Sequence, residues 1–313
     1  MLKILLQVKR TVIIIVALML FAIIFLFSAC SDNTNVNNAE NQQNNAETDQ
    51  TAPDETPTIS EPESTEYEYT ERQSIITAPN DGRTIYGIAF VPADNVAART
   101  VILCHGFGGN LFSVYSQARY FASRGYACFL YDFCGGSMFS MSSGNFFELT
   151  IDSEINDLNV ILDYVSGVSY VDSEKIYIYG YSLGAFVAVS VTADRKDDVA
   201  GLILTAPAFS LADEAVIYYQ TGSYFIMAGE TFIENAYSYC GKVDEMLSSC
   251  EAKTLILHGD KDKLVDISYS EKAAETMPDA SLIAIKGAGH NYDFEEIDFI
   301  QEKSSEFLDS FKE

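Results

Sequence analysis

Short β-branched or aromatic runs alternate with longer amphipathic stretches from Arg83 to the end of the chain. This alternation is typical of a parallel sheet covered by helices. Several of the runs are continuously apolar, as strands buried on both faces should be. The expected strands are 84–90, 100–104, 127–131, 175–179, 201–205, 254–257 and 281–285. The expected helices are 113–123, 151–165, 183–192, 268–277 and 295–311.

Residues 206–252 interrupt this rhythm after the expected strand 201–205, and we interpret them as a short cap insertion over one end of the sheet. Its aromatic residues include Tyr218, Tyr219, Tyr224, Phe225, Phe232, Tyr237 and Tyr239. Such rings suit an aryl acid or an acyl chain, or they pack on the domain as most aromatic residues do. Cys240 and Cys250 are a candidate disulfide pair if the chain is exported.

The N-terminal residues 1–29 have the pattern of an export signal. Basic residues precede the uncharged run 11–29, which ends in small residues before Cys30. The segment resembles a bacterial lipoprotein signal peptide, which implies cleavage before Cys30 and attachment of lipid to its thiol. It departs from that pattern at Phe27, where an aliphatic residue is usual. The alternative is an uncleaved membrane anchor, because the run approaches the length that spans a bilayer.

Residues 30–70 are acidic and rich in Asn, Gln and Thr, without Lys or Arg. A segment with so little apolar surface is expected to be a disordered tether or a plain linker. The folded domain is therefore expected to occupy 71–313. The whole chain carries 45 acidic and 19 basic residues, a net charge of −26, which argues against nucleic-acid binding.

Gly180-Tyr181-Ser182-Leu183-Gly184 lies between an expected strand and an expected helix. A serine on a sharp strand-to-helix turn needs small neighbours, because its backbone is strained and other backbone approaches closely. This context favours a nucleophile elbow with Ser182 as the nucleophile over a plain glycine-rich turn. The backbone N–H of Leu183 is then one donor to an oxyanion.

A glycine-rich loop, His105-Gly106-Phe107-Gly108-Gly109-Asn110, follows the strand 100–104. Its backbone N–H groups can point into a site, and Phe107 is the expected second oxyanion donor. The loop lacks the glycine spacing of a dinucleotide site and the Lys-Ser/Thr pair of a P-loop.

The chain has three histidines, His105, His258 and His290. His290 follows the last strand and is the expected base, while the other two are expected to be structural imidazoles. The order Ser182, Asp262, His290 is the order that accompanies a nucleophile elbow. Asp260 and Asp266 compete with Asp262 for the role of the acid.

Together these motifs resemble those of α/β-hydrolase-fold serine hydrolases, in particular bacterial feruloyl or cinnamoyl esterases, over about 75–311. The resemblance implies that the acid is the second Asp of His258-Gly-Asp-Lys-Asp262. It also implies a mostly parallel central sheet flanked by helices, with neither cofactor nor metal. One departure is Asp132-Phe133-Cys134-Gly135-Gly136-Ser137, where relatives usually carry other polar residues.

The expected function is cleavage of a small-molecule carboxylic ester through an acyl-enzyme, by a serine hydrolase on the extracytoplasmic face of the cell membrane. The expected membrane contact is the N-terminal lipid anchor. The alternatives are a serine peptidase or thioesterase with the same triad, or an inactive surface binding protein.

Overall fold

The computed structural model describes residues 67–78, 81–93, 97–222 and 229–312, which belong to one compact unit, Ser64–Glu313. The expected signal peptide, Cys30 and nearly all of the expected tether lie outside the described residues. In the described part of the chain, no helix is both long and apolar enough to cross a membrane.

Eight strands form a single sheet in the order β1-β2-β4-β3-β5-β6-β7-β8. The pairs β1·β2 and β2·β4 are antiparallel, and every other pair is parallel. This confirms the expected mostly parallel sheet. The strands are β1 Tyr69–Thr77, β2 Thr84–Pro92, β3 Ala98–Cys104, β4 Ala127–Tyr131, β5 Val171–Tyr181, β6 Gly201–Thr205, β7 Lys253–Gly259 and β8 Ala280–Ile285.

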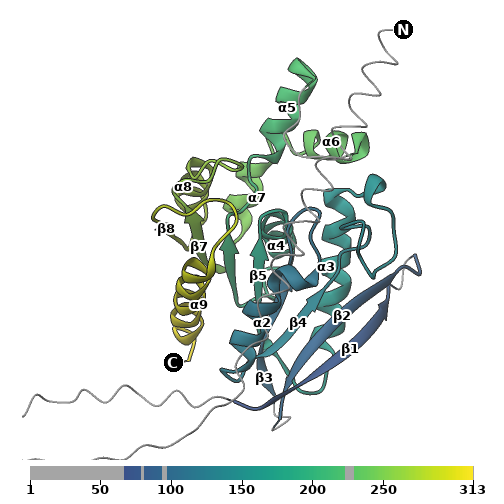
Figure 1. The fold of residues 1–313 in the computed structure, drawn as a ribbon, viewed down its shortest axis with the longest axis vertical. Coiled ribbons are helices and arrows are strands. Elements are labelled where there is room, and N and C mark those ends of the chain that lie inside the picture. Colours follow the sequence, from purple (N-terminus) through teal and green to yellow (C-terminus); the bar gives the residue numbers. More distant parts are fainter. Residues whose placement is uncertain (1–66, 79–80, 94–96, 223–228, 313) are drawn as a thin grey trace, which may run out of the picture. The chain divides into compact units, whose positions relative to one another are not determined.

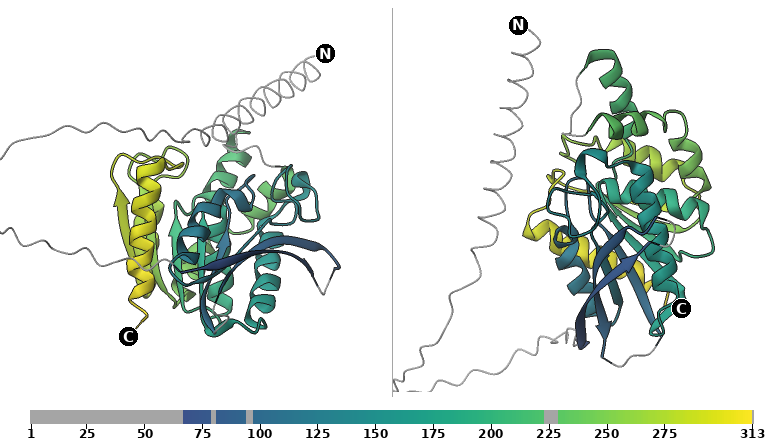
Figure 2. Two further views of the ribbon diagram at one scale, coloured as in Figure 1. Left: turned by 60° about the horizontal axis from the view of Figure 1, so that its bottom comes forward. Right: turned by 90° about the vertical axis from the view of Figure 1, so that its right-hand side faces the viewer.

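Strand β1 is absent from the expected strands, and it begins two residues before the boundary expected for the folded domain. It pairs along its whole length with β2 at the edge of the sheet (Figure 2). Most of its side chains are exposed, including Ile75 at 72%. A strand without a buried face lacks the alternation of apolar and polar residues by which strands are predicted from a sequence.

The five expected helices lie close to their expected positions. The helices are α2 Tyr115–Ala122, α3 Ile151–Ser166, α4 Leu183–Asp194, α5 Leu211–Thr221, α6 Glu230–Tyr237, α7 Val243–Ser249, α8 Ser268–Thr276 and α9 Phe294–Asp309, with 3₁₀ turns η1 Leu111–Val114 and η2 Phe146–Glu148. Helices α5, α6 and α7 were not expected. Capping boxes begin α3 at Thr150 and α9 at Asp293, where each cap side chain accepts from the third helical N–H.

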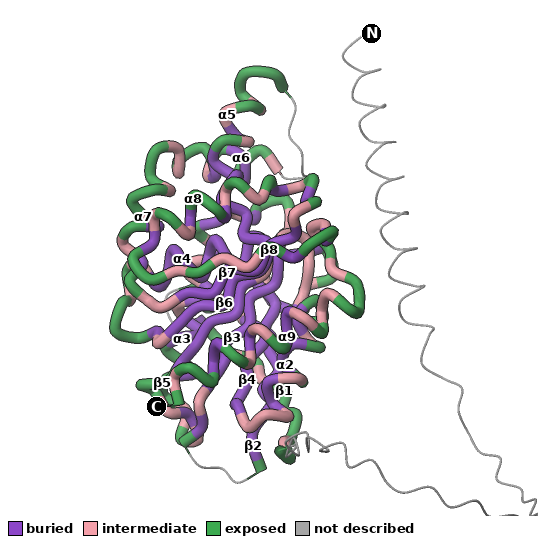
Figure 3. Tube along the Cα trace, turned by 90° about the vertical axis from the view of Figure 1, so that its left-hand side faces the viewer, coloured by how far each residue is buried: buried purple, intermediate pink, exposed green. Residues whose placement is uncertain are grey.

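Helices cover both faces of the sheet (Figure 1). Helices α2 and α9 pack on one face through Phe121 and Leu308, and α3, α4, α7 and α8 pack on the other. Helix α4 is buried on nearly all sides, in agreement with its mostly apolar sequence. The strands form the buried centre, with the exposed positions on the outer helices and loops (Figure 3).

The cap insertion follows β6, as expected, and its described part contains α5, α6 and α7. Cys240 and Cys250 are free thiols, so they do not form the disulfide considered above. The Cys240 thiol instead donates to the Ala212 carbonyl at 3.4 Å. Cys104 and Cys128 are buried in strands, as expected.

Candidate active site

Ser182 stands between the end of β5 and the start of α4, with φ 54° and ψ −116°. A non-glycine residue in this region is strained, and such strain is concentrated at functional sites. Gly180 and Gly184 make the turn feasible. A Cβ on Gly180 would lie 2.5 Å from the Cα of Ala185, and one on Gly184 would lie 2.5 Å from the carbonyl oxygen of Cys104. The flanking glycines are therefore required by close approach of the backbone.

The structure brings Ser182, His290 and Asp262 together from three separate loops. The Nε2 atom of His290 lies 3.0 Å from Ser182 Oγ, and its Nδ1 atom lies 2.7 Å from Asp262 Oδ2. The imidazole therefore joins the hydroxyl to the carboxylate. A neutral imidazole that donates from Nδ1 to a carboxylate presents Nε2 as an acceptor for the serine proton.

Of the three candidate acids, Asp262 is the one whose carboxylate contacts His290. The two competing carboxylates serve nearby turns: Asp260 Oδ1 accepts from the N–H of Gly287 at 2.7 Å, and Asp266 Oδ1 accepts from that of Ser268 at 2.9 Å. Burial raises the pKa of Asp262, but donation from His258 and His290 and from backbone N–H groups outweighs it. The net result is a pKa well below the ordinary value. Asp262 is therefore a carboxylate at neutral pH.

The glycine-rich loop lies directly against the serine. A Cβ on Gly106 would lie 3.1 Å from the Cβ of Ser182. Among the hydrogen bonds of the described residues, none has the backbone N–H of Phe107 or Leu183 as its donor. Both N–H groups belong to segments that border Ser182, and their hydrogens remain available to a ligand.

His105 braces this loop and does not contact the triad residues. Its Nδ1 lies 2.8 Å from the carbonyl oxygen of Gly106, and its Nε2 accepts from the N–H of Phe133 at 3.2 Å. Burial lowers the pKa of His105 below its ordinary value. The ring is therefore neutral, and the expectation of a structural imidazole agrees with these contacts.

Tyr181 is a contributor that sequence reasoning missed. Its hydroxyl lies 3.1 Å from both the carbonyl oxygen of His290 and Oδ1 of Asn291. Its ring lies 5.6 Å from the imidazole of His290. The residue before the serine therefore holds the loop that carries the base, and only its place beside Ser182 offered a signal.

The aromatic residues of the cap insertion divide into separate groups. Phe232 packs against Phe107 at 5.0 Å, and Phe107 packs against Phe146 at 5.4 Å. We name these three rings the aromatic cluster. Tyr239 instead packs on Phe186 of α4 and so supports the domain.

The remaining cap rings form a group on the outside. Tyr219 lies 5.6 Å from Tyr218 and 4.9 Å from Tyr237, and both Tyr219 and Tyr237 are exposed. Tyr224 and Phe225 lie outside the described residues. Of the described cap aromatics, Phe232 is the one that reaches the glycine-rich loop.

The cap insertion is joined to the serine turn through the backbone. The Ser182 N–H donates to the Thr205 carbonyl at 2.9 Å, and the Ala208 N–H donates to the Ser182 carbonyl at 3.1 Å. Ala206 between them has a positive φ of 44°. The first residues of the cap insertion are therefore held by the backbone of Ser182.

Helix α5 of the cap insertion places one carboxylate near the base. The carboxylate of Glu214 interacts electrostatically with His290, and burial raises the pKa of Glu214 above its ordinary value. Its Oε1 accepts from the Ser210 hydroxyl at 2.5 Å. An acidic group in this position favours cationic or hydrogen-bond-donating groups nearby.

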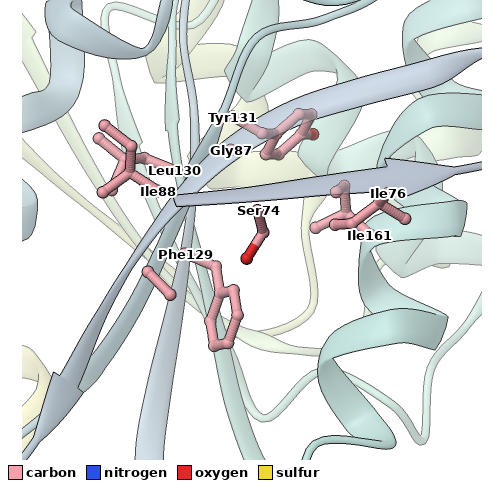
Figure 4. A pocket seen from close by; sticks show the side chains of 9 residues that line it. Ser74, Ile76, Gly87, Ile88, Phe129, Leu130, Tyr131 and Ile161 are labelled. Atoms are coloured by element: carbon pink, nitrogen blue, oxygen red, sulfur yellow. The ribbon is translucent and has the colours of Figure 1, made fainter. Parts of the chain in front are cut away.

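Two cavities of the structure are not lined by Ser182, Asp262 or His290. One, of about 10 Å³, lies where Ser74 of β1 faces Phe129 of β4 and Ile161 of α3 (Figure 4). It has room for at most one water molecule. The other, of about 200 Å³, lies between α5, α7 and α8. In the described part of the chain, no group of three His, Cys, Asp or Glu residues is arranged to hold a metal ion.

Comparisons of the sequence find a family model and relatives that are similar to parts of this chain. A family model described as serine aminopeptidase, S33, matches residues 96–226. An uncharacterised protein of Mycobacterium tuberculosis is 25% identical over 221 residues, which cover 70% of this chain and 72% of that protein. The human alpha/beta hydrolase domain-containing protein 17C is 27% identical over 66% of this chain and 56% of its own length.

Solved structures support the fold. Est1E from Butyrivibrio proteoclasticus, solved with ferulic acid bound, is similar with a TM-score of 0.67 and 22% identity, covering 75% of this chain and 97% of that one. The esterase Pf2001 from Pyrococcus furiosus has a TM-score of 0.59 and 19% identity, covering 78% of this chain and 93% of that one. Sheet order, flanking helices and these matches together show that the chain has the α/β-hydrolase fold.

Proposed function

We propose that the protein is a serine hydrolase that cleaves carboxylic esters through an acyl-enzyme. The observation that carries the proposal is the continuous hydrogen-bonded path from Ser182 Oγ through His290 to Asp262. The strained backbone of Ser182 presents its hydroxyl to that path. This arrangement matches the roles of nucleophile, base and orienting acid.

In the acylation step, Ser182 Oγ attacks the ester carbonyl carbon while His290 Nε2 accepts the hydroxyl proton. Asp262 holds the Nδ1–H tautomer and stabilises the imidazolium that forms. The backbone N–H groups of Phe107 and Leu183 stabilise the negative charge on the carbonyl oxygen. His290 then donates its proton to the departing alcohol, and the acyl group remains on Ser182. Water repeats the same steps and releases the acid.

An apolar, flat acyl group suits the aromatic cluster. Phe107 supplies an oxyanion donor from its backbone and an aromatic contact from its side chain, and Phe232 and Phe146 pack on that ring. Aromatic side chains provide large apolar contact surfaces beside a reacting group. The ferulic acid bound to Est1E is an aryl acid of this kind, which supports aryl-acid esters as the first substrates to test.

A peptidase that acts on free amino termini is the second candidate, and Glu214 favours it. Glu214 interacts electrostatically with His290 and, when ionised, would attract an ammonium group near the base, and the matching family model is described as a serine aminopeptidase. Glu214→Gln separates the two candidates. It raises KM for aminoacyl amides if the peptidase assignment holds, and it leaves KM for neutral esters unchanged if the esterase assignment holds.

We also place the hydrolase at the extracytoplasmic face of the cell membrane, held through lipid on Cys30. The support is the basic segment, the uncharged run 11–29 and the small residues before Cys30. The acidic segment after Cys30 then separates the folded domain from the membrane surface.

The decisive experiment compares the full-length protein with Ser182→Ala in detergent, using aryl-acid methyl esters, aliphatic p-nitrophenyl esters, thioesters and aminoacyl amides. Loss of a triad nucleophile lowers kcat by about 10⁴-fold or more. A fluorophosphonate probe should label the wild type and not the variant. Absence of labelling in a folded wild type would identify an inactive binding protein, and near-normal turnover by Ser182→Ala would refute the assigned nucleophile.

A further inference from the structure

Each carboxylate oxygen of Asp262 lies within hydrogen-bond distance of two donors. Its Oδ1 accepts from the backbone N–H groups of Leu264 at 2.8 Å and Val265 at 3.0 Å. Its Oδ2 lies 2.7 Å from His290 Nδ1 and 3.0 Å from His258 Nε2. Two imidazole rings therefore meet at the same carboxylate oxygen, and the side chains of His258 and Asp262 are both fully buried.

The contacts of His258 determine which of its nitrogens carries the proton. Its Nε2 faces two acceptors, Asp262 Oδ2 and the carbonyl oxygen of Val265 at 3.1 Å, so Nε2 must be protonated. Its Nδ1 lies 2.7 Å from the Ser270 hydroxyl, which can donate to a bare nitrogen. In the opposite tautomer, an unprotonated Nε2 would face these two acceptor oxygens, and neither oxygen would receive a hydrogen bond from the ring.

We propose that His258 is a positioning residue that anchors Oδ2 of Asp262 and limits how strongly that oxygen stabilises protonated His290. The proposal rests on the proposed serine hydrolase function and goes beyond the structural role expected for this histidine. Because two N–H donors share one oxygen, each receives a weaker interaction than a single donor would. The carboxylate is also prevented from rotating away from His290.

The ordering of the influences on Asp262 supports this role. Burial has the largest effect on the pKa of Asp262 and raises it. Among the hydrogen bonds that lower this pKa, the one from His258 has the largest effect, followed by the one from His290. The buried ring of His258 therefore helps to keep the carboxylate ionised. Without this donor, Oδ2 would depend on His290 alone.

Other charged or titratable groups also face these rings. Glu214 acts on His290 from α5, and Asp266 acts on His258 and Asp262 from the loop before α8. Hydrogen bonds from Ser268 lower the pKa of Asp266, so its charge is constant above the acidic range. Burial raises the pKa values of Tyr181 and Tyr292, so both remain neutral. Glu214 is therefore the group whose titration must be separated from the effect of His258.

The first test uses the unmodified full-length protein with ¹⁵N-labelled histidine. The structure assigns an Nε2–H tautomer to His258 and Nδ1–H tautomers to His105 and His290, so nitrogen NMR at neutral pH should show one ring of the first kind and two of the second. The signal lost in His258→Phe identifies the first. A His258 that carries its only proton on Nδ1 would overturn the proposal, and this result does not depend on enzymatic activity.

The second test measures the rate of fluorophosphonate labelling against pH for wild type, His258→Phe and His258→Gln. Phe removes the donor, and Gln offers an amide N–H at similar reach. In His258→Phe, Oδ2 interacts more strongly with protonated His290, so the acid limb should move up by about one pH unit. The plateau rate should fall by about 10 to 100-fold from misplacement of His290. His258→Gln should recover most of both effects.

Each outcome of the second test has a distinct meaning. An unlabelled but folded wild type refutes the proposed function itself. A normal acid limb in folded His258→Phe, or equal shifts in His258→Phe and His258→Gln, refutes only the role of His258. The acid limb of the double variant Glu214→Gln/His258→Phe should lie above that of Glu214→Gln by the same amount as the limb of His258→Phe lies above that of wild type. Loss of the shift in that background would assign it to Glu214 and overturn the proposal.

Discussion

Asp157 provides a quantitative test of how burial of charge affects stability. Its side chain, on α3, is fully buried. Its Oδ2 accepts from the N–H of Cys134 at 2.7 Å, and its Oδ1 lies 3.1 Å from the Arg83 guanidinium without hydrogen-bond geometry. Burial raises the pKa of Asp157 from 3.8 to about 6, although the Cys134 N–H and Arg83 act to lower it.

The direction of the pH effect follows from this raised pKa. The folded state binds the Asp157 proton more tightly than the unfolded state, so its contribution to stability is lost as pH rises from 3.8 through about 6. The full cost above that range is about 3 kcal/mol, at about 1.36 kcal/mol per pKa unit. The part that accrues between pH 5 and 7.5 is about 1.4 kcal/mol. Asp157→Asn keeps an oxygen for the Cys134 N–H and does not titrate.

Urea denaturation of wild type and Asp157→Asn between pH 5 and 7.5 measures this effect, above the isoelectric point near 4.3. The free energy of unfolding of the variant, relative to wild type, should increase by about 1.4 kcal/mol over that range. Asp163→Asn is the matched control, because Asp163 lies on the same helix with its side chain 70% exposed. A difference between Asp157→Asn and wild type that stays constant with pH would refute the reasoning.

Three further changes test other parts of the structure. Gly184→Ala places a Cβ 2.5 Å from the Cys104 carbonyl oxygen and should cost about 2 kcal/mol or more, read from urea midpoints; wild-type stability would contradict the close approach. Phe232→Ala should cost about 3 kcal/mol and lower kcat/KM for aryl-acid esters, whereas the exposed Tyr237→Ala should change stability by less than about 0.5 kcal/mol. Equal effects of these two variants would argue against the aromatic cluster as part of the acyl site. Cys30→Ser should abolish incorporation of radiolabelled palmitate in cells, and continued incorporation would exclude Cys30 as the lipidated residue.

The buried strands could be predicted because their composition reports burial directly. The runs at β4 and β6 are buried at every position and almost entirely apolar, and both strands have the expected bounds. Strand β1 could not be found in this way, since Glu71, Arg72 and Gln73 point to solvent and its pairing with β2 depends on backbone hydrogen bonds. Edge strands with charged residues avoid edge-to-edge association, and the same charges conceal them in a sequence.

The positions of the site residues could be predicted where a turn or chain order restricts them. Ser182 could be predicted because glycines flank it on a strand-to-helix turn. His290 could be predicted because it follows the last strand. The contact between His258 and Asp262 could not be predicted, because it depends on how the loop 260–267 folds back on the end of β7. The position of Glu214 beside His290 depends on the path of the cap insertion, which the sequence pattern left undefined.

The backbone link between Ser182 and the first residues of the cap insertion has a consequence for engineering. Because Ala208 is hydrogen-bonded to Ser182, the segment that holds the serine turn ends there, and α5, α6 and α7 lie beyond it. Substitutions between Phe209 and Cys250 therefore leave the backbone partners of Ser182 in place, provided that the buried side chains of this segment are kept. The exposed positions of the cap insertion, such as Tyr219 and Tyr237, are therefore the ones to exchange, whereas Phe232, Ile233 and Leu247 must stay because they pack in the main core.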